Sequence, residues 1–195
     1  MLAPHERVLE GLVTTENEDG SVNLAPMGPV TDDCQTHFLL KPFQTSTTYA
    51  NLKRTGKAAF HVTDDVAMLA AAAIGRLSAC DVPEMRTEQG YHIVGTACRW
   101  YGLEVVDQVI DTERAQFACS VVAIGTLREY FGLNRAKHAV LEAAILATRI
   151  RLLPPAEIEE QLSRLRPWVE KTGALVEHQA FEMLTRYVRE NQVPE

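Results

Sequence analysis

Four consecutive hydroxyl side chains are the most unusual local feature of this sequence: Thr45, Ser46, Thr47 and Thr48. They lead into residues 49–55, which the pattern predicts to be a short helix with Thr48 as its N-cap. The first backbone N–H groups of a helix have no partner within it and lie at the positive end of its dipole, so a phosphate can bind there. Positive charge is available nearby from Lys41, Lys53 and Arg54. The alternative is a hydroxyl-rich loop that only caps the helix.

A second segment, residues 23–29, has the composition of a strand end that could face a ligand. Pro26 and Pro29 cannot donate backbone hydrogen bonds, and the small residues between 23 and 29 let a flat ligand approach main-chain groups. Gly28 belongs to this small-residue stretch, and Met27 offers a polarizable surface for an aromatic ring. The alternative is a simple strand terminator with a buried methionine.

Other patterns with known chemistry are absent from the sequence. The chain contains no GxGxxG, GxxxxGK[ST], HExxH or GxSxG motif. Its six histidines lack the spacing of metal ligands and its four cysteines form no CxxC pair, so no metal site is predicted. Asp32-Asp33 and Asp64-Asp65 fall where a turn and a helix cap are expected. No residue is therefore assigned a catalytic role.

The composition is that of an acidic globular chain. The 195 residues include 19 Lys and Arg against 26 Asp and Glu, a net charge of −7, which argues against a protein that grips nucleic acid. The longest apolar run, residues 66–74, is about half of the roughly 20 residues that a bilayer span requires. Residues 1–10 lack the apolar region of a secretory signal. We therefore expect a cytoplasmic protein with reduced cysteines and no membrane or nucleic-acid partner.

The order of the elements predicts an α+β chain, mainly β. Alternation and turn residues predict three strands joined as an antiparallel meander, with Asp19-Gly20 as the first turn; the strands cover residues 7–15, 22–27 and 37–40. Further strands are expected at 57–62, 96–107 and 117–128, and helical periodicity begins at Asn134. Strands first and helices last indicate an antiparallel barrel or sandwich, residues 1–132, and a helical C-terminal segment, residues 133–195, that packs on the barrel or on a second subunit.

Taken together, these segments carry a resemblance that neither carries alone. The ordered set runs from Asn17-Glu18-Asp19-Gly20 through Asn23-Leu-Ala-Pro-Met-Gly28 to Ser46, Thr48-Tyr49-Ala-Asn51-Leu52 and Thr55-Gly56. It continues with Thr63-Asp64-Asp65, the stretch from Asn134 to Val140, and Ala147-Thr148-Arg149. This set resembles the FMN-binding split β-barrel of flavin reductases and pyridoxamine-phosphate-oxidase relatives. More narrowly, it resembles the DUF447 family, over nearly the whole chain.

The resemblance implies a homodimer with one FMN at each subunit interface. It implies that Thr45, Ser46, Thr47 and Thr48 hold the FMN phosphate with Lys41 as a helper. It further implies that Pro26, Met27 and Gly28 line the isoalloxazine and that Asn51 steadies the loop or the ribityl chain. Position 47 departs from the pattern, because relatives often carry a basic residue where this chain has Thr47, and a weaker grip on the phosphate is expected.

The function expected from this resemblance is a flavin-dependent oxidoreductase of the flavin-reductase kind, in which the flavin carries the hydride chemistry. Three alternatives stay open. The chain could be an FMN-binding module without turnover, a reductase of a pterin or deazaflavin-type substrate, or a structural dimer that has lost the cofactor. A separate hypothesis has Arg135 and Lys137 facing an anionic ligand or an acidic group across the dimer.

Overall fold

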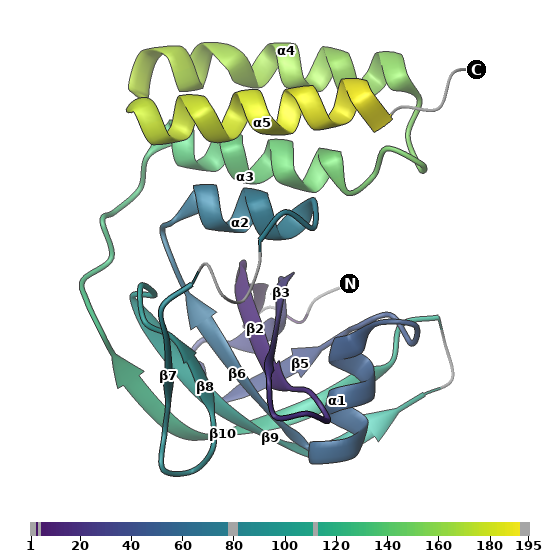
Figure 1. The fold of residues 1–195 in the computed structure, drawn as a ribbon, viewed down its shortest axis with the longest axis vertical. Coiled ribbons are helices and arrows are strands. Elements are labelled where there is room, and N and C mark those ends of the chain that lie inside the picture. The colour runs from purple at the N-terminus through teal and green to yellow at the C-terminus, as the bar shows by residue number, and fades with distance from the viewer. Residues whose placement is uncertain (1–2, 4, 78–81, 111–112, 192–195) are drawn as a thin grey trace. The chain divides into compact units, whose positions relative to one another are not determined.

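The computed structural model describes residues 3, 5–77, 82–110 and 113–191. The chain divides into two compact units (Figure 1), which we call the barrel unit, residues 1–63 and 79–130, and the helical unit, residues 64–78 and 131–195. The sequence had placed residues 64–78 in the barrel. They belong to the helical unit because the apolar helix that they contain packs against two C-terminal helices.

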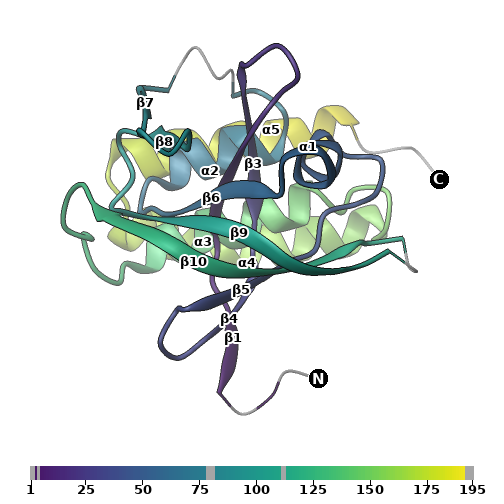
Figure 2. The ribbon, with the colours of Figure 1, turned by 90° about the horizontal axis from the view of Figure 1, so that it is seen from below.

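The described part of the barrel unit contains ten strands and one helix. The strands are β1 (Glu6–Val8), β2 (Gly11–Glu16), β3 (Val22–Met27), β4 (Val30–Asp32), β5 (His37–Leu40), β6 (Lys57–Val62), β7 (Glu84–Arg86), β8 (His92–Val94), β9 (Arg99–Val109) and β10 (Gln116–Thr126), and the helix is α1 (Thr47–Thr55). Eight of the strands form one antiparallel sheet in the order β1-β4-β5-β10-β9-β6-β2-β3, and β7 pairs with β8 in a separate hairpin. The long strands β9 and β10 run across the middle of this unit (Figure 2). The mainly antiparallel class with added helices is as predicted.

The predicted meander is wrong. Its first strand, residues 7–15, is divided into β1 and β2, which lie far apart in the sheet order, whereas the strands at 22–27 and 37–40 are observed. β2 and β3 form the expected hairpin, and Gly20 takes the left-handed φ of 80° that its turn requires. β5, however, lies between β4 and β10 in the sheet and is not adjacent to β3. β3 ends at Met27, one residue after the paired Pro26, and the additional strand β4, which begins after Pro29, carries the chain to the other half of the sheet. As a result, β3 is an edge strand.

Aromatic side chains from three strands fill the interior of the sheet. The ring centroid of Phe38 lies 5.2 Å from that of Phe60 and 5.2 Å from that of Tyr101, and all three side chains are buried. Leu40, Leu103 and other apolar residues complete this cluster. Burial of aromatic side chains contributes strongly to stability and fixes the facing strands in one register.

His61 joins three strands from inside the barrel unit. Its Nδ1 donates to the carbonyl of Leu12 (3.2 Å), and its Nε2 accepts from the backbone N–H of Val94 (3.2 Å). Both ring nitrogens are used only if the imidazole is neutral, and the side chain is 0% exposed. Burial therefore lowers the pKa of His61 to about 4, against a small opposing effect of the Leu12 carbonyl.

This buried imidazole predicts that the protein loses stability as the pH falls from about 6.5 to about 4. The unfolded chain binds the proton in that window and the folded chain does not, so the free energy of unfolding should fall by about 3 kcal/mol. Urea denaturation at pH 7, 5.5 and 4.5 measures this loss. The variant His61→Gln, which retains a donor and an acceptor without titrating, should show a flatter dependence. Equal pH slopes for the two proteins would show that His61 is not the group responsible.

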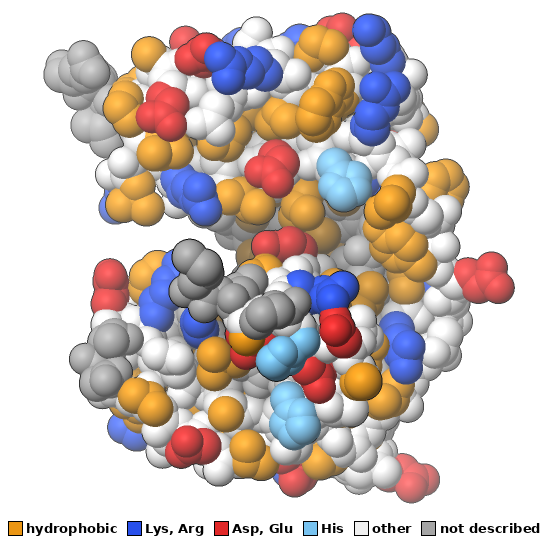
Figure 3. Space-filling view, turned by 180° about the vertical axis from the view of Figure 1, so that it is seen from behind, with side chains coloured by type: hydrophobic (Ala, Val, Ile, Leu, Met, Phe, Trp, Pro, Cys, Tyr) orange, Lys and Arg blue, Asp and Glu red, His pale blue; other side chains and the backbone are white. Residues whose placement is uncertain are grey.

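The described part of the helical unit has four helices: α2 (Val66–Ala73), α3 (Arg135–Ala147), α4 (Pro155–Thr172) and α5 (Leu175–Asn191). α3 packs against each of the other three. This explains why α3 buries seven of its thirteen residues, among them Ala136, Val140 and Leu146. No described helix is long and apolar enough to cross a membrane. Acidic and basic side chains are mixed on the face shown in Figure 3, so the excess of negative charge is not gathered in one region of it.

Lys137 is engaged inside the helical unit. Its Nζ donates to the backbone carbonyl of Asp64 (2.7 Å) and lies 3.2 Å from a carboxylate oxygen of Glu177. Burial alone would raise the pKa of Glu177, but the Ala174 N–H and the Lys137 ammonium outweigh it and lower that pKa. Lys137 therefore joins α3 to the segment before α2 and to the start of α5. The acidic group that Lys137 faces is Glu177 of its own chain, where the sequence hypothesis had an anionic ligand or an acid of a second subunit.

Removing the charge of Lys137 should destabilise the protein, because the buried Glu177 carboxylate would lose its cation. We expect Lys137→Met to lower the free energy of unfolding by roughly 2 kcal/mol, and Lys137→Met with Glu177→Leu to restore part of it. Chemical denaturation measures both changes. The exposed Lys171→Met is the matched control and should stay within about 0.5 kcal/mol of the wild type. A Lys137→Met protein as stable as this control would contradict the structural role.

Candidate functional site

Helix α1 begins at the hydroxyl run, but with a different cap from the predicted one. Ser46 is the N-cap: its Oγ accepts from the backbone N–H of Tyr49 (3.2 Å) and donates to the carbonyl of Phe43 (2.7 Å). The prediction of Thr48 as N-cap is wrong, because Thr48 is already helical. The helix ends as predicted at Gly56, whose φ of 65° is left-handed. The first turn of α1 contains no acidic side chain of its own.

The four hydroxyl residues do not share one environment. Thr45 and Thr47 are exposed, and Ser46 is partly buried. Thr48 is only 3% exposed and its Oγ1 accepts from the side-chain amide of Asn23 (3.0 Å). Thr45 and Thr47 are thus available to an external anion beside the start of α1, whereas Thr48 bonds to the sheet.

Asn51 is the centre of a buried polar cluster that fastens α1 to the β2–β3 hairpin. Its Nδ2 donates to Thr15 Oγ1 (3.0 Å) and to Asn17 Oδ1 (2.9 Å). Asn23 Nδ2 donates to the same Thr15 oxygen (3.1 Å) as well as to Thr48. At 4% exposure, the Asn51 side chain faces the cluster. This geometry favours the expectation that Asn51 steadies the segment, and its contact with a ribityl chain stays a prediction.

Edge strand β3 leads from this cluster to the predicted ring-binding residues. Pro26 pairs with Leu12 and Met27 with Gly11 on the inner side of the strand, while no described strand lies along its outer side. Pro26 is exposed, and Met27 and Gly28 are partly buried. From Asn23, which contacts Thr48, to Met27 the strand spans about 13 Å. The hydroxyl run at residues 45–48 therefore lies at the start of β3, and residues 26–28 lie at its end.

The cations near α1 differ from those expected. Lys53 and Arg54 occupy its last turn, where they suit the negative end of the helix dipole, and Arg54 donates to the backbone carbonyl of Glu16. Lys41 follows β5 and is partly buried. Arg114, which the sequence analysis missed, forms an isolated β-bridge with Phe43, three residues before the N-cap. No local signal marks Arg114, because strand pairing brings it there from a distant part of the chain.

The architecture and both halves of the sequence match one family. A family model described as the N-terminal domain of a protein of unknown function, DUF447, matches residues 9–128. A second model, for the remainder of DUF447, matches residues 134–186. The chain belongs to the DUF447 family. A search among curated proteins found no match.

Solved structures place the DUF447 chain in the flavin reductase-like FMN-binding fold. The FMN-bound DUF447 protein MM1853 from Methanosarcina mazei is similar at 21% identity with a TM-score of 0.79, over 92% of this chain and 94% of that one. Flavin reductase HpaC complexed with NADP+ has 12% identity and a TM-score of 0.55, over 64% and 81% of the two chains. Flavoredoxin from Methanosarcina acetivorans has 11% identity and a TM-score of 0.53, over 64% and 71%. The predicted split barrel with a helical C-terminal segment is confirmed.

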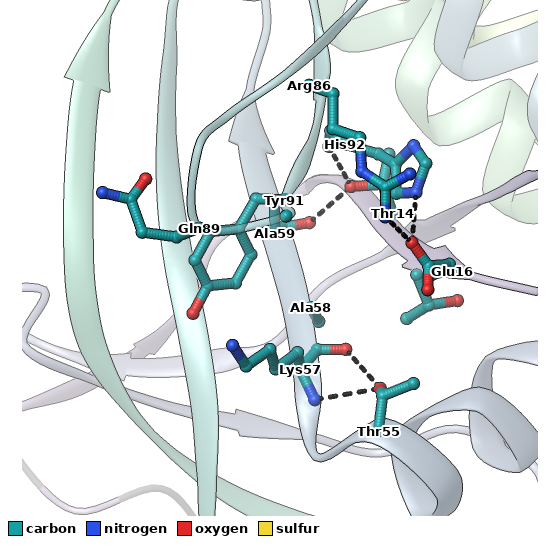
Figure 4. Close-up of a pocket in the computed structure, with 12 residues that line it drawn as sticks. Thr14, Glu16, Thr55, Lys57, Ala58, Ala59, Arg86, Gln89, Tyr91 and His92 are labelled. Atoms are coloured by element: carbon teal, nitrogen blue, oxygen red, sulfur yellow. Dashed lines mark hydrogen bonds and ion pairs between the residues drawn. The ribbon is translucent and has the colours of Figure 1, made fainter. Parts of the chain in front are cut away.

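The barrel unit of the DUF447 chain also contains a cavity of about 240 Å³ between β2, β6 and the β7–β8 hairpin (Figure 4). None of the nine predicted ligand residues lines it. His92 lies between the carboxylates of Glu84 and Glu16, and Arg86 pairs with the same Glu16 side chain. The charged groups on this side of the cavity are thus paired with one another.

Tyr91 and Lys57 form the other side of this cavity. The Tyr91 hydroxyl is buried and has no hydrogen-bond partner among the described residues. Burial, and to a lesser degree the charge of Glu104, raise the pKa of Tyr91 to about 12, so the phenol stays protonated at neutral pH. The Nζ atom of Lys57 lies 3.6 Å from Oε1 of Glu104, so these two side chains form an ion pair. Across the described residues, no group of three His, Cys, Asp or Glu side chains could hold a metal ion.

The Asn51 cluster predicts a stability effect that can be measured without any ligand. Asn51→Ala removes both amide donations and leaves Thr15 and Asn17 with one partner fewer in a buried setting. The free energy of unfolding should fall by about 1–3 kcal/mol in chemical denaturation. Asn191→Ala, at the exposed end of α5, serves as the control and should be close to neutral. If Asn51→Ala were as stable as this control, the cluster would not be what holds α1.

Proposed function

We propose that this chain binds FMN and is an oxidoreductase of the flavin-reductase kind. The observation that carries the proposal is the placement of Thr45 and Thr47 at the open start of α1, joined by edge strand β3 to Pro26, Met27 and Gly28. The family relative from Methanosarcina mazei, described as FMN-bound, supports the choice of cofactor.

The residues present fit such a group. A phosphate at the start of α1 would meet the hydroxyls of Thr45 and Thr47 and the first helical N–H groups, with Lys41 nearby. A flat ring at the other end would lie on Pro26 and Met27, next to Gly28, against which the side chains of Val8 and Glu10 already pack. The outer side of β3 offers backbone N–H and C=O groups, which are suited to the polar edge of an isoalloxazine.

The cofactor and the protein would have different tasks in such an enzyme. Bound FMN would accept and pass on a hydride or electrons, which is chemistry that protein side chains lack. The chain's own residues bind the phosphate, orient the ring along β3 and limit the access of water. We assign no side chain a proton-transfer role. The electron donor that we propose is a reduced nicotinamide dinucleotide, since the similar flavin reductase HpaC is described with NADP+ bound.

We propose further that the active form is a homodimer with FMN at the subunit interface. The long strands β9 and β10 leave Val106, Val122 and Ile124 more than half exposed, and a second copy would remove these side chains from water. The cytoplasmic location and the absence of a nucleic-acid partner, both expected from the sequence, stay predictions.

Absorption spectroscopy of the purified protein tests the proposal directly. A flavin spectrum that co-elutes with a dimer, with or without added FMN, is the expected result, followed by bleaching when NADH or NADPH is added without oxygen. Bound flavin that no nicotinamide reduces would favour the FMN-binding module. Reduced flavin that passes electrons only to a pterin or deazaflavin acceptor would favour that reductase. A protein that refuses FMN at high micromolar concentration would favour the structural dimer.

Charge at position 47 should control FMN affinity in both directions. Thr47→Glu places a negative charge at the phosphate position and should weaken FMN binding at least tenfold, whereas Thr47→Arg should strengthen it. A glutamate in the first turn favours the helix, so loss of binding would not reflect unfolding. Thr126→Glu, at an exposed end of β10, is the matched control. Fluorescence titration that gave the same Kd for all four proteins would place the phosphate elsewhere.

A further inference from the structure

The cavity beneath the β7–β8 hairpin forms where two strands of the sheet separate. The pairing of β2 with β6 ends at Thr14 and Ala59. β2 nevertheless continues to Glu16, and β6 already begins at Lys57. The hairpin covers this opening, since the Thr14 hydroxyl donates to the backbone carbonyl of His92 (2.6 Å). The space left between them is about 240 Å³ (Figure 4), whereas a cavity of about 150 Å³ is enough to bind benzene.

The Tyr91 side chain lines this cavity in a fixed position. Its ring packs with Ala59 and Ile93 on the outer face of the sheet. It also lies directly on β9, because a Cβ atom at Gly102 would be only 3.0 Å from the ring. The hydroxyl is buried and has no hydrogen-bond partner among the described residues. A buried donor without a partner is unfavourable, so a ligand that accepted its hydrogen bond would be stabilised.

The charged side chains that line the cavity already have counter-charges. On one wall, Arg86 and His92 both contact the carboxylate of Glu16. On the other, Nζ of Lys57 lies 3.6 Å from the carboxylate of Glu104, which is longer than an N–H···O hydrogen bond, so the ammonium can still donate. Since these charges balance one another, an ion would gain little attraction here for the loss of its hydration. The cavity therefore favours a neutral ligand.

We propose that this cavity is a second binding site, for a small neutral molecule with one ring and a carbonyl group. The ring would lie on the Ala59 side chain, and the carbonyl oxygen would accept from the Tyr91 hydroxyl. Nζ of Lys57, which is 5.7 Å from the centre of the Tyr91 ring, is at the same end of the cavity and can donate a second hydrogen bond (Figure 4). None of the residues predicted to hold FMN lines the cavity, so the inference does not depend on the proposed function.

Chemical-shift titration of the ¹⁵N-labelled full-length protein with benzamide tests this site. Benzamide has one ring and an uncharged carbonyl group, and benzoate and benzylammonium are anionic and cationic molecules of similar size. Tyr91→Phe removes the hydroxyl and keeps the ring. Tyr130→Phe, at an exposed tyrosine, is the matched control. The titration is repeated with excess FMN, and the melting temperature of each variant is measured.

We expect benzamide to bind with a Kd of about 1 mM, at least about fivefold more tightly than either charged molecule, and with the same Kd when FMN is present. The backbone amide signals of residues 57–59 and 89–92 should shift. Tyr91→Phe should weaken binding about five- to tenfold without lowering the melting temperature, because the lost hydroxyl had no partner in the protein. Tyr130→Phe should change neither quantity.

Four results would overturn the second site. They are shifts confined to other residues, tighter binding of a charged molecule, an unchanged Kd in Tyr91→Phe, and competition between benzamide and FMN. A lower melting temperature of Tyr91→Phe would also contradict the inference, since the hydroxyl would then have a partner within the protein. A protein that binds benzamide in this cavity but refuses FMN would overturn the proposed function and leave this site standing.

Discussion

The hydrogen bonds of the Asn51 side chain are the constraint on which the candidate site depends. They hold a nine-residue helix, too short to be stable alone, against a two-stranded hairpin that is itself marginal. A buried amide is tolerated only when its donors are satisfied, so the cluster admits essentially one placement of α1. That placement turns Thr48 toward the sheet and leaves Thr45 and Thr47 outside.

The remainder of the barrel unit positions the β2–β3 hairpin to which α1 is bound. The ring cluster around Phe38 fixes β5, β6 and β9 in register, and β6 positions β2 and its hairpin partner β3. Because β3 ends the sheet, its outer backbone groups are open along the line that joins the two candidate ligand segments. An edge strand is normally a liability for aggregation, and Pro26 on its exposed side limits pairing with another chain.

Features set by neighbouring residues could be predicted from the sequence. The spans of β3, β5 and β6, the end of α1 at Gly56, the cap Asp65 and the start of a helix near Asn134 all follow from local chemistry, and each is observed. Strand order could not be predicted, because it depends on which distant strands share the aromatic core. The same limit hid Arg114, which pairing carries to Phe43. The choice of Ser46 over Thr48 as N-cap is subtler, because the hydroxyls are chemically alike and are distinguished by their partners, the Phe43 carbonyl for Ser46 and the Asn23 amide for Thr48.

The path of the chain through α2 has a consequence for how the protein is made. The chain leaves the barrel unit after Thr63, completes a helix of the other unit, and returns for the remaining strands before the C-terminal helices are synthesised. On the ribosome, the apolar side chains of Val66, Leu69 and Ala70 therefore lack their partners while roughly sixty residues are added before α3 begins and roughly a hundred before α5 begins, several seconds at ordinary translation rates. For the same reason, truncation after residue 132 would not yield a separate barrel. It would leave the apolar helix α2 without the helices that cover it, and such an exposed apolar helix is a typical binding target of chaperones.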